Sequence, residues 1–213
     1  MTPVREKTPA RRFLWLANQR ALDFLNTEVI ARGERVDLLQ SYADLVAWLA
    51  EADLVSGDAL REARERWADA PAGRRVLADA RALRGELRLA VDRILAGKPV
   101  PQSALDAVNA LLRERAGWTE LVRSGRRIAR RFHFEVGEPR RLLVPLAEAA
   151  SDLLCEVDFA RVRRCENPAC ILYFYDTSKN HGRRWCSMSG CGNRMKAAAH
   201  YRRMRGLPPA SRE

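Results

Sequence analysis

Four of the five cysteines stand in two pairs with the same internal spacing. Four residues separate the cysteines within each pair, and fifteen residues separate the two pairs. A short turn with two thiolates places both sulfurs on one tetrahedral ion, and two such turns leave no open position for water. The spacing therefore predicts one structural zinc ion, bound by Cys165, Cys170, Cys186 and Cys191.

Two disulfides or four unrelated thiols are the alternatives to this zinc site. Disulfides are rare in reducing compartments, and the N-terminal residues MTPVREKTPARR lead into no apolar signal segment. No stretch approaches the roughly 20 apolar residues of a membrane span. We therefore expect a cytoplasmic protein with no membrane partner, and we favour zinc. Cys155 follows Leu154 on the apolar face of an expected helix, which indicates an ordinary buried thiol.

The residues around the cysteines predict a small module built to hold the ion. The run ILYFY at 171–175 is typical of a strand, residues 176–180 supply a turn, and residues 183–185 return toward the second pair. Cys191 then opens a helix that runs to about Arg205 and ends at Gly206 and the proline pair at 208–209. A knuckle, a hairpin and a helix N-terminus around zinc form a treble-clef-like arrangement.

Residues 161–204 contain the motifs RRCENPAC, DTSKN and RRWCSMSGCGNRMKAAAHYRRMR, with the tetrapeptide CGNR at 191–194. This segment closely resembles the CGNR zinc finger, and the resemblance assigns the same four cysteine ligands. Upstream, LDFLNT at 22–27 and the helix with Leu45, Trp48 and Leu49 resemble the ABATE domain of stress-induced transcription regulators, which is usually paired with that finger. The resemblance implies a bacterial DNA-binding regulator.

Basic residues are concentrated in the last quarter of a chain whose formal net charge is +11. The residues from Arg161 onward hold 12 Lys or Arg against three acidic residues, whereas residues 1–160 hold 26 against 24. Such a segment attracts polyanions, and Arg in a helix can read guanine in the major groove. We therefore predict a surface for duplex DNA formed by Lys179, Arg183, Arg184, Arg194, Lys196, His200, Arg202, Arg203 and Arg205.

Other uses of this segment stay open at this point. The basic face could be solvated without a dedicated partner. Tyr173 and Tyr175 alternate with apolar residues, so an exposed pair would stack unpaired bases and favour RNA or single-stranded DNA. Packing of these tyrosines against Trp185 is the commoner use of such aromatic residues.

A nuclease is the third hypothesis, because some treble-clef folds place His and Asn around a catalytic metal. His181, Asn193 and His200 invite the comparison, and Glu166 and Asp176 are the nearby carboxylates. The reaction needs a second ion and a base that activates water, and no pattern in the sequence supplies them. We therefore expect no catalytic residue and no enzyme.

The region upstream of the cysteines has mainly helical periodicity. Apolar spacing of about 3.6 residues predicts helices over 21–31, 58–67, 74–96 and 146–157, and two more that begin after Ser41 and Ser103 as N-caps. Residues 32–37, RGERVD, are expected to form a polar loop. Residues 127–136 and 142–144 predict one β-hairpin.

The expected fold is therefore a mainly α N-terminal domain at 10–157 with one β-hairpin, followed by a small α+β, treble-clef-like zinc module at 158–206.

Asp23 and Asn26 could line a ligand pocket, although buried polar contacts explain them equally well. His133 is expected to be a packed surface residue. We predict a zinc-dependent DNA-binding protein, a transcriptional regulator whose N-terminal domain senses a small-molecule inducer or mediates association. The alternative is an RNA- or single-strand-binding protein without operator specificity.

Overall fold

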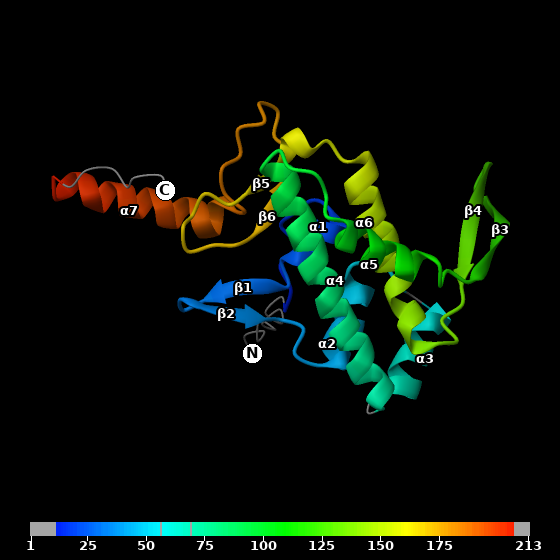
Figure 1. Ribbon diagram of the computed structural model, residues 1–213. Helices are drawn as coiled ribbons and strands as arrows, with labels where there is room; N and C mark the ends of the chain where they lie inside the picture. The colour runs from blue at the N-terminus through cyan, green and yellow to red at the C-terminus, as the bar shows by residue number, and fades with distance from the viewer. Residues whose placement is uncertain (1–11, 56, 69, 207–213) are drawn as a thin grey trace, which may run out of the picture.

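A helical body occupies the middle of the molecule, and a small cysteine-containing module lies at one end (Figure 1). The computed structural model describes residues 12–55, 57–68 and 70–206. The helices of the body are α1 (Arg20–Leu25), α2 (Tyr42–Glu51), α3 (Gly57–Trp67), α4 (Pro71–Leu95), α5 (Gln102–Leu112) and α6 (Val144–Glu156). No helix of these described residues is long and apolar enough to cross a membrane.

In the described residues, three two-stranded antiparallel hairpins accompany the helices. They pair β1 (Glu28–Ala31) with β2 (Glu34–Asp37), β3 (Gly117–Ser124) with β4 (Arg127–Phe134), and β5 (Val162–Arg164) with β6 (Tyr173–Tyr175). The chain ends in α7 (Asn193–Met204), which projects away from the body. The predicted fold class is confirmed: a mostly helical N-terminal region precedes a small hairpin-and-helix module with clustered cysteines.

Local sequence signals set the start of α2 and the end of α4, as predicted, whereas α4 begins at Pro71, before the expected start at residue 74. The Ser41 hydroxyl accepts the Asp44 N–H at 3.2 Å, and the Asp44 carboxylate accepts the Ser41 N–H at 2.7 Å, which forms a capping box. Pro71 opens α4, where its missing N–H costs no hydrogen bond. Gly97 follows the end of α4 at φ +67°, a conformation that glycine adopts without strain.

One continuous apolar core joins the body to the C-terminal module. The rings of Phe24 and Trp48 lie 5.3 Å apart in this core, and Leu83 and Leu87 of α4 are buried beside them. Tyr173 of β6 belongs to the same cluster and is fully buried. The module is therefore docked on the body by shared packing rather than only tethered to it by the chain.

The structure corrects the helix expected over 21–31 and the loop expected over 32–37. The helix ends at Leu25, and the following residues form the β1–β2 hairpin. Arg32 and Gly33, the two residues of the turn, have φ values of +54° and +89°, as a type I′ turn requires. The glycine at this position was the signal for a tight hairpin, and the polar composition concealed it.

The one hairpin predicted for the N-terminal domain has different strands from those expected. β4 pairs with β3 over eight residue pairs, from Gly117 with Phe134 to Ser124 with Arg127. Residues 142–144 form no strand; they lie in a 3₁₀ turn and the start of α6. The two-residue turn that contains Gly125 at φ +61° fixes the pairing, and the weaker alternation of residues 117–124 hid the first strand.

Within the C-terminal module, β6 pairs with β5 and not with residues 183–185, which form no strand. The hairpin therefore encloses the first cysteine pair.

Cys155 was expected to be buried but is exposed, because the buried face of α6 runs through Leu146, Ala150 and Leu153. The proline pair at 208–209, expected to end α7, lies outside the described residues.

Ser103 was expected to cap α5, but the helix begins at Gln102 with Pro101 at its N-cap. The Ser103 hydroxyl instead donates a hydrogen bond to Glu86 of α4 at 2.7 Å. A serine inside the first turn can therefore act as a contact between helices rather than as a cap.

Asn26 connects the body to β6 by pairing with a backbone unit of the strand. Its side-chain amide donates to the Tyr173 carbonyl at 2.8 Å, and its side-chain carbonyl accepts the Tyr173 N–H at 2.9 Å. Asn26 is 1% exposed, so no water replaces these bonds if they are lost. One side chain thus supplies β6 with the two hydrogen bonds that a further strand would have provided.

We expect the substitution Asn26→Ala to lower the free energy of unfolding by about 2–4 kcal/mol, because it leaves a buried N–H and a buried C=O of Tyr173 without partners. Asn109→Ala, at an exposed position of α5, is the matched control and should change the free energy by no more than about 0.5 kcal/mol. Denaturant unfolding of both variants measures the difference. Equal stability of the two would show that Asn26 does not hold the junction.

Candidate metal centre

The four predicted cysteines form one compact cluster. Their sulfur atoms all lie within 4.8 Å of one another. The Cys170 and Cys186 sulfurs are 3.9 Å apart, and the Cys186 and Cys191 sulfurs are 3.6 Å apart. A tetrahedral zinc ion with bonds of about 2.3 Å requires sulfurs separated by about 3.8 Å. The cluster therefore fits one zinc ion and leaves no room for a fifth ligand at its centre.

Three different kinds of local structure bring these sulfurs together. Cys165 follows directly after β5, and its N–H donates to the Leu172 carbonyl at 2.9 Å. Cys170 ends a tight turn in which its N–H bonds to the Asn167 carbonyl. Cys191 lies in a π-type turn, Met188–Gly192, that runs straight into α7. The first turn of α7 is thus fixed at the metal centre.

Asn167 is a residue that the sequence analysis did not single out, although it stands in the quoted motif RRCENPAC. Its side-chain amide donates to the Cys191 sulfur at 3.1 Å, and its side-chain carbonyl accepts the Ala169 N–H at 3.1 Å. The side chain is buried. Asn167 therefore ties the first cysteine turn to the second and stabilises negative charge on a ligand sulfur.

The crowding of the sulfurs makes the ionisation of each cysteine depend on its neighbours. A hydrogen bond from the Cys170 thiol lowers the pKa of Cys165 to about 2, and the same bond raises the pKa of Cys170 to about 12. The pKa of Cys186 is raised for the same reason. Without a cation the cluster therefore ionises one sulfur at the expense of its neighbours. A dication reverses this competition because each ligand thiolate then lies beside a positive charge.

Arg183 holds the chain between the two cysteine pairs. Its guanidinium donates to the carbonyls of Leu16, Trp185 and Cys186, at 2.9 Å and 3.0 Å for the first two. It also lies 4.2 Å from the centroid of the buried Phe174 ring. The side chain is only partly exposed. The Arg183 guanidinium therefore stabilises the fold, because its hydrogen bonds connect the body to the second cysteine pair.

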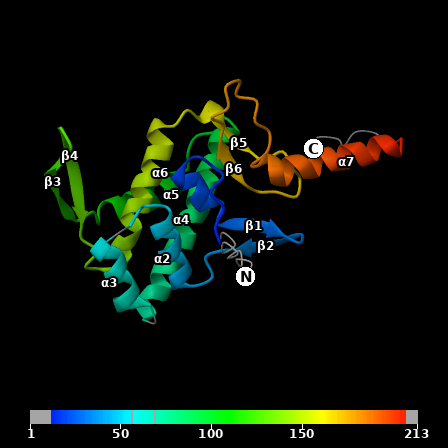
Figure 2. The same cartoon turned by 180° about the vertical axis from the view of Figure 1, so that it is seen from behind.

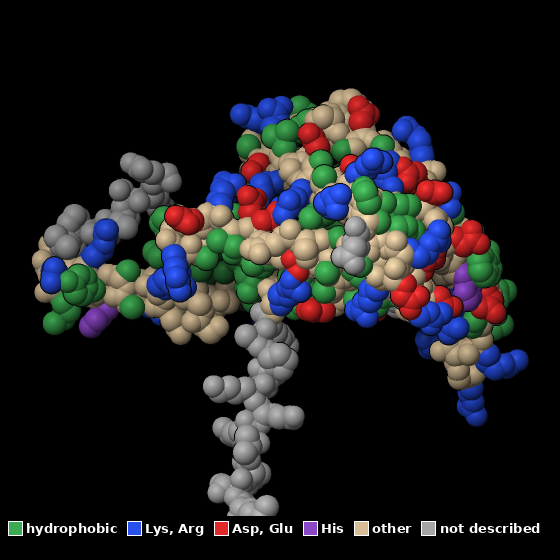
Figure 3. Space-filling view, turned by 90° about the horizontal axis from the view of Figure 1, so that it is seen from below, with side chains coloured by type: hydrophobic (Ala, Val, Ile, Leu, Met, Phe, Trp, Pro, Cys, Tyr) green, Lys and Arg blue, Asp and Glu red, His purple; other side chains and the backbone are tan. Residues whose placement is uncertain are grey.

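The other predicted nucleic-acid contacts lie in two exposed groups. Lys179 lies in the loop after β6, and Arg184 pairs there with Glu166 at 2.6 Å and lies over the Trp185 ring. The remaining residues are all exposed on or directly after α7: Arg194, Lys196, His200, Arg202, Arg203 and Arg205. Figure 3 shows blue and purple side chains along this projecting arm.

The structure does not offer the tyrosine pair as a base-stacking platform. Tyr173 is fully buried, and its hydroxyl donates to Asp92 at 2.7 Å. Tyr175 is half-buried, with the Arg161 guanidinium 4.6 Å from the centroid of its ring. Tyr173 packs in the core of the body, whereas Trp185 packs against the cysteine cluster. Both tyrosines therefore serve the junction between module and body.

The carboxylates considered for a nuclease already have partners. Asp176 is fully buried and accepts hydrogen bonds from Ser178 and from the Arg183 N–H at 2.9 Å. Glu166 pairs with Arg184. These contacts give both carboxylates roles in holding loops, and they lend the nuclease hypothesis no support.

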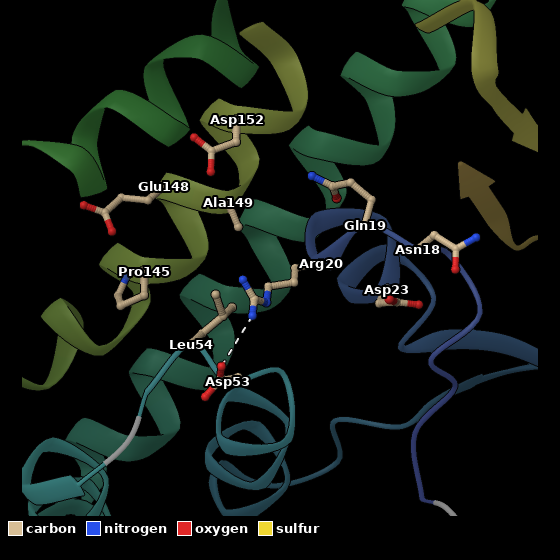
Figure 4. A pocket seen from close by; sticks show the side chains of 10 residues that line it. All are labelled: Asn18, Gln19, Arg20, Asp23, Asp53, Leu54, Pro145, Glu148, Ala149 and Asp152. Carbon is tan, nitrogen blue, oxygen red and sulfur yellow. Dashed lines mark ion pairs between the residues drawn. The ribbon is translucent and has the colours of Figure 1, made fainter. Parts of the chain in front are cut away.

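A polar hollow of about 630 Å³ lies on the body between α1, α6 and the turn after α2 (Figure 4). Asp23 lines it and accepts the N–H groups of Leu16 and Ala17 at 3.0 Å and 2.9 Å. Burial raises the pKa of Asp23 to about 6 despite these two bonds. Asn26 lies in the junction with Tyr173 instead. Of the two residues weighed for a ligand pocket, only Asp23 reaches this hollow.

We expect Cys170→Ser to lose the bound metal, because three thiolates cannot complete the tetrahedral shell. Cys155→Ser is the matched control, since Cys155 is exposed and lies outside the cluster. Elemental analysis should find about one zinc ion per chain in the control and far less in Cys170→Ser. Equal zinc content in the two variants would show that Cys170 is not a zinc ligand.

Comparison with known proteins identifies both parts of the chain. Residues 18–157, more than half of the sequence, match the ABATE family, which is described as a putative stress-induced transcription regulator. Residues 161–204 match the CGNR zinc finger. No curated protein matches the chain closely enough to count as a relative. The chain therefore belongs to the ABATE family of transcription regulators and carries a C-terminal CGNR zinc finger.

Proposed function

We propose that this protein binds duplex DNA through α7 and acts as a transcriptional regulator. The observation that carries the proposal is the exposure of α7: none of its side chains is buried, and the helix carries four Lys or Arg residues, a histidine and no acidic residue. A helix in a protein core buries one face. A helix without a buried face keeps a fixed direction only if one of its ends is anchored. A helix that also carries a net positive charge is suited to bind a polyanion.

The dimensions of α7 suit the major groove. Its 12 residues span about 18 Å, and the groove is about 12 Å wide, enough to admit a helix. Lys196, His200 and Arg203 share one side of the helix at helical spacing. Arg194 and Arg205 extend the basic surface at its two ends, and the Arg205 guanidinium lies 4.4 Å from the centroid of the Tyr201 ring.

The zinc ion is proposed to be structural and single. Cys165, Cys170, Cys186 and Cys191 would hold it and would fill its coordination sphere, so it would supply no site for a reacting water. Its part in function is to fix the direction in which α7 leaves the module. We propose no catalytic residue and no enzymatic activity.

The other basic residues of the module divide by what they contact. Lys179 is exposed and is proposed to touch a phosphate beside α7. Arg184 is proposed to contact a phosphate only if it leaves its ion pair with Glu166. Arg183 is proposed to act through the fold, because its donors are engaged with three carbonyls.

The N-terminal domain is proposed to sense a signal or to mediate association. The polar hollow beside Asp23 is the place where a small-molecule inducer would bind. The hollow lies next to the junction with the zinc module, because Asn18 lines it and donates to the Tyr175 carbonyl at 3.2 Å. This proximity supports a regulatory role, and a cytoplasmic location follows from DNA as the partner.

We expect the double substitution Lys196→Glu with Arg203→Glu to weaken duplex DNA binding about a hundredfold at moderate salt, because two attractions to phosphate become repulsions. Both residues are exposed, so zinc content and circular dichroism should not change. The charge-matched control is Arg74→Glu with Arg75→Glu, two exposed residues of α4.

Fluorescence anisotropy with duplex DNA, single-stranded DNA and duplex RNA measures this effect. Weaker binding of duplex DNA by the α7 variant than by the control supports the proposal. Tighter binding of single strands or RNA by the unmodified chain would favour the alternative of a binder without operator specificity. Equal affinity of the α7 variant and the control would show that duplex DNA does not bind to α7.

A further inference from the structure

A second basic element stands at the opposite end of the molecule from α7. The β3–β4 hairpin, called here the ribbon (residues 117–134), protrudes from the body as two strands, and no other strand of the described residues pairs with them. Figures 1 and 2 show it and α7 at opposite ends in both views. Most of its residues are exposed and none is buried, and Figure 3 shows Lys and Arg side chains at its protruding end.

The ribbon is strongly basic, although residues 1–160 as a whole carry almost no net charge. Residues 1–160 are almost balanced in charge, but the ribbon holds five arginines against one acidic residue, Glu120. Glu120 is already paired with His133 at 2.6 Å. Within the described part of the chain, no hydrogen bond or ion pair engages the side chains of Arg123, Arg126, Arg127, Arg130 and Arg131.

The register distributes these arginines over both faces of the ribbon. Arg127 and Arg131 lie on one face, opposite Ser124 and Glu120 respectively. Arg130 and Arg123 lie on the other face, because their partners Leu121 and Ile128 fall on the alternate positions of the strands. Arg126 occupies the turn. An element with cations on both faces and at its tip is suited to a site with negative charge on both sides.

The base of the ribbon is braced, so its direction is fixed. The rings of Trp118 and His133 stack with centroids 5.0 Å apart and planes 5° from parallel. The Arg115 guanidinium lies 3.8 Å from the centroid of the Phe132 ring on the other face. Arg115 in turn pairs with Glu148 of α6 at 2.6 Å. These contacts connect the root of the ribbon to the helical body.

Apolar side chains lie among the cations. Leu121 is 69% exposed and Ile128 is 76% exposed, both on the face that carries Arg123 and Arg130. Such residues contact sugars and thymine methyl groups in a DNA groove. Association with a second ribbon would also cover them, but it would bring two sets of five unpaired arginines together. Charge therefore favours a polyanion over a second copy of the chain.

We propose that the ribbon is a second contact for duplex DNA and enters a groove of its own. The major groove of B-DNA admits a two-stranded β-ribbon, and its two walls carry phosphates that would face the arginines on both sides. The major groove of A-form RNA is too narrow for side chains to read. The inference extends the proposed function, because it adds to DNA binding by α7 a second site at the far end of the molecule.

The separation of the two elements makes the proposal specific. Because α7 and the ribbon lie at opposite ends, one short duplex cannot occupy both. The chain should therefore hold two short duplexes at once, or two distant segments of a long one. A protein that binds DNA through α7 alone would hold one.

Sedimentation of the full, zinc-loaded chain with a short labelled DNA duplex tests this directly. We expect two duplexes per chain for the unmodified protein and one for Arg127→Glu with Arg130→Glu, which reverses one charge on each face. The variant Arg127→Lys with Arg130→Lys keeps the charges and should still bind two. The control Arg74→Glu with Arg75→Glu should also bind two. Circular dichroism and zinc content check that every variant is folded.

The outcomes separate this inference from the proposed function. Two duplexes for the unmodified chain and one for each of the ribbon and α7 variants support both proposals. One duplex for the unmodified chain, lost in the α7 variant and kept in the ribbon variant, overturns the ribbon alone. Loss in the ribbon variant without loss in the α7 variant overturns the role of α7. Duplex RNA bound at the ribbon as tightly as DNA would overturn the choice of DNA as its partner.

Discussion

The anchoring of α7 at the cysteine cluster is the constraint on which the rest of the account depends. Packing cannot orient this helix, because none of its side chains is buried. Cys191 lies in the turn that leads directly into it, and three other sulfurs surround that cysteine. The direction in which α7 leaves the module therefore follows from the turn at the cysteine cluster. Four thiolates at this spacing would repel one another, and a bound cation would relieve the repulsion.

The metal centre in turn depends on the helical body. Tyr173 of β6 is buried in the core of the body, and Asn26 pairs with its backbone. Arg183 reaches from the module to the Leu16 carbonyl, and the N–H of Leu16 donates to Asp23. The LDFLNT motif is thus largely a docking motif for the zinc module. Body and finger are joined by buried and partly buried hydrogen bonds, so a change in the body at this junction would reach the residues that flank the cysteine cluster.

Local signals in the sequence were sufficient for the metal centre and for most helices. The cysteine spacing predicts the cluster because short turns fix how far apart two ligands can lie. The capping box of Ser41 and the apolar spacing of α4 predict their helices in the same way. These features depend on residues that are close in sequence, and their geometry follows from local rules.

Features that depend on distant residues were not predictable. The contact of Asn26 with Tyr173 joins residues 147 positions apart in the chain. The β1–β2 hairpin was missed because its turn looked like a polar loop. The arginines of the ribbon were hidden by acidic residues elsewhere in the same region. Only the folded chain shows that Arg183 is engaged in the fold whereas Arg130 is not.

The most direct test of the account is the affinity for duplex DNA of the metal-stripped variant Arg127→Glu with Arg130→Glu, which lacks the ribbon contact, as zinc is returned stepwise. If the metal centre orients α7, affinity should be low without zinc and should rise to a plateau at about one zinc ion per chain. The helical signal of the body should change little over the same titration. An affinity that is already full in the stripped chain, with α7 still exposed, would contradict the claim that zinc positions the DNA-binding helix.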